Sequence, residues 1–148
     1  MYQILLVEDD LKICDVINTY FLSRSDNQLK LNIIHNGNDA LEALYENQYD
    51  LVLLDIMLPG ADGFQICKSI RENNDTPIIF LTARGLEEDI LRGYDLGCDD
   101  YIVKPFSLAT LYAKVNALLN RTKGTIISNE LSAGNIRLNP RTMNIYLD

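Results

Sequence analysis

The chain has 148 residues, of which 47% are hydrophobic and 23% charged, and its formal net charge is −8. These values are typical of a globular domain of ordinary size, and the acidic balance excludes a general basic surface for nucleic acid. No apolar run approaches the roughly 20 residues of a membrane span, and the N-terminus MYQILLVEDD lacks a signal-peptide pattern. Three cysteines without metal-type spacing are predicted to be buried thiols of a reducing compartment: Cys14, Cys67 and Cys98.

In chain order, short apolar runs alternate with segments of helical periodicity. The predicted strands are residues 3–8, 29–34, 50–55, 77–82 and 100–103. The predicted helices begin at or near Leu11, Asp39, Gly63, Glu87 and Leu108. Gly97 is interpreted as a helix C-cap, Ser107 as an N-cap, and Asp10 as a turn former or N-cap. Five strands alternating with five helices predict a doubly wound α/β fold, because parallel strands need right-handed crossover helices.

Polar side chains stand where the predicted strands end, and such sheets bind ligands at the carboxyl ends of their strands. Glu8 and Asp9 end the first strand, Asp55 the third and Thr82 the fourth, and Lys104 follows the fifth. Each residue also has an ordinary interpretation: an acid can form a turn, a threonine can favour a strand, and a lysine can be solvated. The functional interpretation therefore rests on their coincidence at one edge.

Such a cluster has a definite chemistry. Carboxylates in close contact repel one another unless a cation lies among them or some are protonated. A few oxygen ligands with room for water suit Mg²⁺, and a carboxylate beside Mg²⁺ can attack phosphorus to give an acyl phosphate. Asp9 and Asp55 are therefore candidate metal ligands. Lys104 and Thr82 are candidates to balance the charge of a phosphoryl group.

Four motifs resemble the receiver domains of two-component response regulators: ILLVEDD, LVLLDIMLPGADGF, PIIFLTA and DDYIVKPF. The resemblance covers residues 1–121 and implies the flavodoxin-like receiver fold with strand order 2-1-3-4-5. It implies that a partner histidine kinase phosphorylates Asp55. It also implies cofactor Mg²⁺, bound by Glu8, Asp9, Asp55 and the carbonyl of Met57. Under this resemblance Thr82 and Tyr101 form a switch pair, in which the threonine hydroxyl moves to the phosphoryl group and the aromatic ring turns inward. Lys104 is the family's lysine, in a cis peptide with Pro105.

Two other function classes compete with the receiver. A hydrolase could use Asp55 as a nucleophile on external substrates, but Met57 stands where such phosphatases usually have a second acid. A pseudo-receiver would no longer switch, which the intact set of Asp9, Asp55, Thr82 and Lys104 argues against. The expectation is a cytoplasmic protein, without membrane contact, that catalyses only its own aspartyl phosphorylation and dephosphorylation.

The C-terminal segment is predicted to differ from the receiver. Residues 122–131 are polar and mixed, and are interpreted as a linker. In residues 132–148, alternating apolar residues around Asn139-Pro140 predict a β-hairpin. This hairpin is similar to the first strands of the winged-helix effector domain of OmpR/PhoB-like regulators. The favoured expectation is a truncated DNA-binding domain, and the alternative is a hairpin docked on the receiver.

The same resemblance implies a homodimer that forms on phosphorylation. In that subfamily the fourth helix, fifth strand and fifth helix pair across the interface, which corresponds here to residues 87–121. The charged candidates for cross-subunit pairs are Arg92, Asp99, Asp100 and Lys114. Ile90 and Thr110 stand where the family commonly has a base and an acid, so one usual ion pair is missing. The competing interpretation is a solvated charged face.

Overall fold

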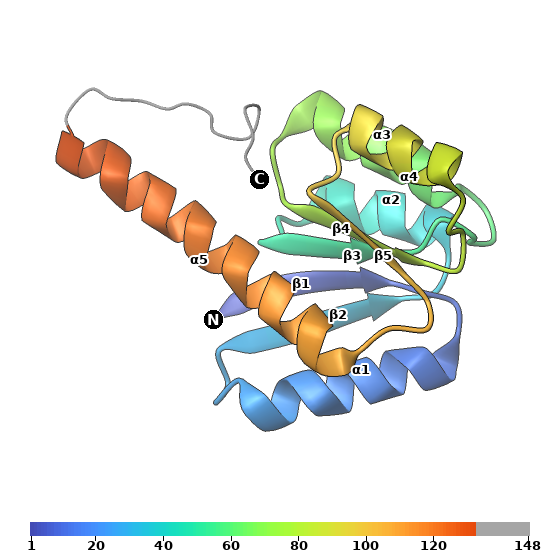
Figure 1. Ribbon diagram of the computed structural model, residues 1–148, viewed down its shortest axis with the longest axis horizontal. Helices are drawn as coiled ribbons and strands as arrows, with labels where there is room; N and C mark the ends of the chain where they lie inside the picture. The colour runs from blue at the N-terminus through green and yellow to red at the C-terminus, as the bar shows by residue number, and fades with distance from the viewer. Residues whose placement is uncertain (133–148) are drawn as a thin grey trace. The chain divides into compact units, whose positions relative to one another are not determined.

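The computed structural model describes residues 1–132, and the side chains of residues 1–121. The chain divides into two compact units, Met1–Tyr112 and Ala113–Asp148. The first unit contains a five-stranded sheet (Figure 1). The strands are β1 (Tyr2–Val7), β2 (Leu29–Ile34), β3 (Leu51–Leu54), β4 (Ile78–Thr82) and β5 (Asp100–Val103). The helices are α1 (Leu11–Arg24), α2 (Gly37–Glu46), α3 (Gly63–Asn73), α4 (Glu87–Leu96) and α5 (Leu108–Ser132), of which α5 begins in the first unit and continues in the second.

The sheet has the predicted topology. Its strands run parallel in the order β2-β1-β3-β4-β5. Every residue of β3 and β4 is buried, as expected for central strands covered on both faces. The strand order reverses between β1 and β3, because the chain moves outward from β1 to β2 and then returns to β3. The carboxyl ends of β1 and β3 therefore flank the crevice in which doubly wound sheets bind ligands.

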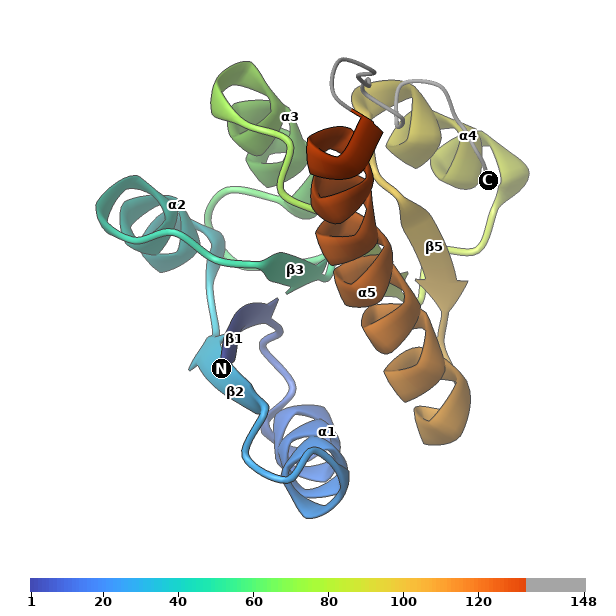
Figure 2. The same ribbon diagram turned by 90° about the vertical axis from the view of Figure 1, so that its left-hand side faces the viewer.

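Apolar packing on both faces holds these strand ends in place. The helices α2 and α3 lie on one face and α1 on the other (Figures 1 and 2). The core on the α2 and α3 face contains fully buried residues such as Val52, Ile66 and Phe80. On the other face, α1 buries Ile17 and Phe21. Each such side chain contributes roughly 1.5 to 3 kcal/mol when it leaves water, so the sheet is a firm support for its polar edge.

Capping residues fix the helix ends. The side chain of Asp10 caps α1, which confirms that prediction. Gly97 ends α4 with a left-handed φ of +107°, which favours glycine, and is the predicted C-cap. The helix α2 begins at Gly37, two residues earlier than predicted. Asn36 accepts a hydrogen bond from the backbone N–H of Asp39 at 2.8 Å, so residues that look like a turn form the first turn of the helix.

The helix α5 is longer than predicted and includes residues 122–131, which were expected to form a linker. The physical reason is that no proline interrupts residues 108–132. The one glycine in the unexpected part, Gly124, costs a helix only about 1 kcal/mol. The predicted hairpin strands, with Ile136 and Ile145, lie outside the described residues. No helix in the described part of the chain is long and apolar enough to cross a membrane.

The three cysteines are buried free thiols, as predicted. Burial raises the pKa of Cys14 and of Cys67 to about 11. It also raises the pKa of Cys98 above its usual range. These thiols are protonated at neutral pH and therefore have the character of small apolar core residues rather than of nucleophiles.

Candidate functional site

The carboxyl ends of β1 and β3 bring three carboxylates together. Glu8 and Asp9 follow β1 and Asp55 follows β3, and one carboxylate oxygen of each lies within 4.8 Å of the others. Glu8 and Asp55 are buried, with 1% and 5% of their surfaces exposed, whereas Asp9 is exposed. The structure therefore places the predicted acids at one site that is open to solvent on one side.

Asp55 is fixed by its own backbone and by the loop that follows it. Its N–H donates to the carbonyl of Val7 at 3.0 Å, so the contact between β1 and β3 extends to this residue. Its Oδ1 accepts a hydrogen bond from the N–H of Met57 at 3.2 Å. The chain then passes so close to Gly63 that a Cβ atom there would lie 2.6 Å from the Cα of Ile56. Glycine at the start of α3 thus allows the loop to close against the site.

Lys104 places a positive charge between two of the acids. Its Nζ lies 2.7 Å from Oε1 of Glu8 and 3.1 Å from Oδ2 of Asp55. The Lys104-Pro105 peptide is cis, as predicted. Burial alone would lower the pKa of Lys104, but the hydrogen bond to Glu8 and the charges of both acids outweigh it and raise this pKa. The ammonium group therefore stays charged, and one positive charge faces three carboxylates.

The charge state of Glu8 depends on its burial. Burial raises the pKa of this carboxyl above its ordinary value of 4.5, and the charge of Asp55 adds to the rise. Hydrogen bonds from Lys104 and from the backbone N–H of Asp10 oppose it. The net result is a raised pKa, so the folded protein holds the Glu8 proton more tightly than the unfolded chain does.

We expect this raised pKa to appear in the pH dependence of stability. When one group has a higher pKa in the folded state, its contribution to the free energy of unfolding falls as pH rises from the unfolded value through the folded value. Without metal, the wild type should therefore lose stability relative to Glu8→Gln as pH rises from 4.5. Urea unfolding at several pH values measures the difference. Glu88→Gln, at an exposed position of α4, should follow the wild type; a difference between wild type and Glu8→Gln that does not change with pH would contradict the assignment.

The predicted switch residues meet at the backbone of Arg84. Thr82 is fully buried at the end of β4, and its hydroxyl oxygen accepts a hydrogen bond from the N–H of Arg84 at 3.3 Å. The hydroxyl of Tyr101 donates to the carbonyl of Arg84 at 2.6 Å. The Tyr101 ring is 5.7 Å from the ring of Phe80, so it lies inward against the core. Burial raises the pKa of Tyr101 to about 12, which keeps this donor protonated.

Two side chains predicted for the dimer face have partners within their own subunit. Asp99 Oδ2 is 3.0 Å from Nη2 of Arg71 and accepts a further hydrogen bond from the N–H of Ile78 at 2.8 Å. The guanidinium carbon of Arg92 lies 4.2 Å from the centre of the Phe64 ring. A cross-subunit pair at either position would have to compete with these contacts. Asp99 and Arg92 are therefore weaker candidates than their charges alone suggest.

The remaining dimer-face candidates lie on β5 and α5. Asp100 is half-buried, and its Oδ1 lies 3.3 Å from the hydroxyl of Tyr94. Lys114 belongs to α5 and is half-buried. The helix α4, its N-cap and β5 also expose several large hydrophobic side chains: Leu86, Leu91, Tyr94 and Val103.

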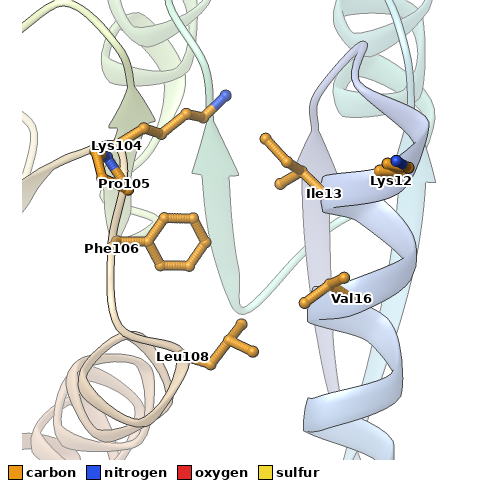
Figure 3. A pocket seen from close by; sticks show the side chains of 7 residues that line it. All are labelled: Lys12, Ile13, Val16, Lys104, Pro105, Phe106 and Leu108. Carbon is orange, nitrogen blue, oxygen red and sulfur yellow. The ribbon is translucent and has the colours of Figure 1, made fainter.

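A groove of about 480 Å³ lies beside the acid site, between α1 and the segment that joins β5 to α5 (Figure 3). Phe106 points across it toward Ile13 and Val16. The stem of Lys104 borders the groove, while its ammonium group points away toward the acids. The lining is largely apolar and consists of Lys12, Ile13, Val16, Lys104, Pro105, Phe106 and Leu108. This groove was not predicted, because its walls come from opposite ends of the domain's sequence.

The ion pair between Arg84 and Asp89 was also not predicted. Asp89 is 6% exposed, and its Oδ1 is 3.0 Å from Nη2 of Arg84. A sequence signal for it exists. Asp89 lies one helical turn before Gly93, which is on the buried face of α4, and a buried acid needs a cationic or hydrogen-bonding partner.

The family model for the response regulator receiver domain matches residues 4–116 of this chain. The chain belongs to this family. The receiver is 43% identical over 123 residues to the transcriptional regulatory protein ResD of Bacillus subtilis, a match that covers 83% of this chain and 50% of ResD. It is 37% identical over 146 residues to the regulatory protein VanRB of Enterococcus faecalis, covering 99% of this chain and 64% of VanRB. The chain thus spans between 50% and 64% of the length of these relatives.

Solved receiver structures show the same fold. The receiver domain of the Francisella response regulator 1452 matches with a TM-score of 0.76 and 36% identity, covering 82% of this chain and 99% of that one. The BeF3-activated receiver domain of DrrB matches with a TM-score of 0.74 and 32% identity, over 81% and 98% of the two chains. DrrB is described as a Thermotoga maritima OmpR/PhoB homolog. The flavodoxin-like receiver architecture is therefore established for this chain.

Proposed function

We propose that this receiver is the phosphorylation-controlled switch of a two-component transcriptional regulator, and that Asp55 accepts the phosphoryl group from a histidine kinase. The observation that carries the proposal is the position of Asp55. It is a buried carboxylate at the carboxyl end of the central strand, 3.1 Å from the ammonium of Lys104 and close to two further acids. The regulatory proteins to which the chain is similar support the same function.

The donor set fits Mg²⁺. Glu8, Asp9 and Asp55 supply carboxylate oxygens near one another, and the exposed side at Asp9 leaves room for water, which Mg²⁺ usually keeps. The carbonyl of Met57 is proposed as a further ligand, since its N–H already contacts Asp55. A bound Mg²⁺ would balance the charges of the acids and of the phosphoryl oxygens. Lys104 alone leaves this site with excess negative charge.

The proposed reaction is a transfer between two side chains. A carboxylate oxygen of Asp55 attacks phosphorus, an O–P bond forms, and the P–N bond of the kinase phosphohistidine breaks, leaving its electron pair on the imidazole. Lys104 would balance charge on the phosphoryl oxygens and Thr82 would donate its hydroxyl to one of them. Hydrolysis of the acyl phosphate restores Asp55. The hydrolase alternative lacks support, because the position two residues after Asp55 is Met57.

Magnesium dependence tests this function. Incubation with a small phosphodonor and Mg²⁺ should add one phosphoryl group, measured as intact mass, because phosphodonors can react without a kinase when the site itself positions the phosphorus. Excess chelator should reduce the rate at least about a hundredfold, since removal of one electrostatic group at a reacting centre has an effect of about that size. Equal labelling with and without chelator would contradict a metal-assisted transfer to Asp55.

The groove beside Lys104 is proposed as the contact for the kinase. Its largely apolar lining, with Phe106 opposite Ile13 and Val16, offers a surface for an apolar side chain or helix of the partner. A partner seated there would touch the stem of Lys104, whose ammonium group lies in the acid site. Docking at the groove would therefore bring a donor close to Asp55.

Dimer formation is proposed to use the exposed apolar side chains of α4 and β5. Leu91 is 60% exposed on α4, so Leu91→Asp would place a charge in the contact and should prevent dimers of the phosphorylated protein. Tyr45→Asp is a matched control, because Tyr45 is 91% exposed on α2. Light scattering with beryllofluoride and Mg²⁺ should show dimers for the wild type and Tyr45→Asp, and monomers for Leu91→Asp. Dimers of equal stability in all three would place the interface elsewhere.

DNA contact is proposed to belong to an effector domain and not to the receiver. The net charge of −8 gives the chain no general attraction to phosphates. In the whole regulator, phosphorylation of the receiver would then control DNA binding through the dimer it promotes.

A further inference from the structure

Arg84, in the loop between β4 and α4, makes contacts to both switch residues. The N–H of Arg84 donates to the hydroxyl oxygen of Thr82, and the carbonyl of Arg84 accepts the hydroxyl of Tyr101. The hydrogen bonds of Thr82 and Tyr101 therefore both depend on the position of the Arg84 backbone. A displacement of Arg84 would break both hydrogen bonds.

The side chain of Arg84 also connects the loop to α4 through an ion pair. Its Nη2 lies 3.0 Å from Oδ1 of Asp89, in the first turn of that helix. The side chain of Asp89 is 9% exposed, whereas that of Arg84 is 43% exposed, so a buried carboxylate is paired with a guanidinium that stays exposed to solvent. The hydrogen bond and charge of Asp89 raise the pKa of Arg84 above its ordinary value, in agreement with this geometry.

The Tyr101 ring packs against α4. At Gly93, one turn after Asp89 on α4, an added Cβ atom would lie 3.0 Å from Cδ2 of the ring. The inward ring is thus in contact with the helix that carries Asp89. Three contacts therefore connect β5, the loop and α4. The Tyr101 hydroxyl joins β5 to the loop, the ion pair joins the loop to α4, and the Tyr101 ring contacts α4 directly.

We propose that the ion pair between Arg84 and Asp89 is a lock that holds the loop in the conformation which keeps Tyr101 inward. In this conformation the carbonyl of Arg84 is in place to accept the tyrosine hydroxyl. Breaking the ion pair frees the loop and lowers the population of the inward ring. Arg84 and Asp89 are then positioning residues. Their effect on phosphorylation rests on the proposed function of Asp55 and on the expectation that the Tyr101 ring turns inward when Asp55 carries a phosphoryl group.

A simpler role for Asp89 is to stabilise α4 as an acid near the helix N-terminus. Glu87 and Glu88 already supply exposed acids in that first turn. An acid that acts only on the helix dipole has no need to be buried, and burial of a carboxylate is costly unless a partner compensates for it. The burial of Asp89 against Arg84 therefore favours the lock.

A double-mutant cycle tests the lock with Asp89→Asn, Arg84→Gln and the two combined; Glu88→Gln is the control. The first readout needs no ligand: the nuclear Overhauser effect between the Tyr101 ring and the Hα of Gly93. The second is the beryllofluoride concentration that half-saturates the protein in excess Mg²⁺. The third is the urea midpoint, which reports stability alone.

If the lock exists, each single variant weakens the Overhauser effect and raises the half-saturating concentration about fivefold or more, and the double variant is no worse than either. If Arg84→Gln changes neither readout, Asp89 acts through the helix alone and the lock is refuted. Arg84→Gln decides the question even if Asp89→Asn fails to fold. A wild type that does not bind beryllofluoride would refute the proposed function, while the Overhauser effect would still decide the lock.

Discussion

Replacing Asp55 by asparagine is expected to abolish phosphorylation of this receiver by small phosphodonors. Asparagine has the same size and can still accept the hydrogen bond from the N–H of Met57, so the loop should keep its path. It lacks the anionic oxygen that attacks phosphorus and one of the oxygens close to Glu8 and Asp9. Intact mass after incubation with Mg²⁺ and a phosphodonor measures the result directly.

The matched control for this experiment is Asp50→Asn. Asp50 stands immediately before β3, at the opposite end of the strand from Asp55, and accepts a hydrogen bond from the N–H of Gln3 at 2.7 Å. Because its side chain is away from the acid site, this variant should gain one phosphoryl group at the wild-type rate. If the Asp55 variant were labelled equally fast, the acceptor would be another residue and the proposed chemistry would be wrong.

Gly63→Ala is expected to be strongly damaging, although it adds only one methyl group near the site. The added Cβ atom would overlap the carbonyl oxygen of Asp55 and lie 2.6 Å from the Cα of Ile56, so backbone and not a flexible side chain must move. Overpacking of this kind costs about 3 kcal/mol in the free energy of unfolding. A shift of about 1 Å in Asp55 would also slow phosphorylation about a hundredfold.

Gly85→Ala is the control for added volume. There a Cβ atom would meet a side-chain atom, Cγ1 of Val103, at 3.0 Å, and Val103 is 37% exposed and free to adjust. The cost should stay below about 1 kcal/mol. Urea unfolding and the rate of phosphorylation should therefore separate the two variants. Equal stability of both variants would mean that the backbone of the loop after Asp55 can shift to accommodate the added methyl group at little cost.

Local sequence patterns could predict the sheet and its polar edge. A run such as LVLL is apolar throughout because the crossover helices of a parallel sheet cover both of its faces, so the run itself predicts a central strand. Once the strands are parallel, their ends must lie together, and Glu8, Asp55 and Lys104 follow strands directly. The parallel arrangement of the strands is therefore enough to predict that these residues lie close together.

Other features depend on contacts that no local pattern carries. The hydrogen bond of Arg71 to Gly97 and its ion pair with Asp99 join segments far apart in the chain. For this reason the sequence alone suggests that the charge of Asp99 is available at a dimer face. Arg84 looks like a solvated loop residue until the fold brings Asp89 beside it. The start of α2 was placed two residues late because asparagine and glycine serve both turns and helix caps.

The contacts of Arg71 also determine how α4 can move. Its Nε donates to the carbonyl of Gly97 at 2.9 Å, immediately after the last residue of α4, while its other nitrogens contact Thr76 and Asp99. One end of a ten-residue helix, about 15 Å long, is thereby anchored to α3. If the opposite end of α4 is displaced, the helix is expected to turn about this anchored end. The displacement would then grow with distance from Gly97, so it would be larger at Leu86 than at Tyr94.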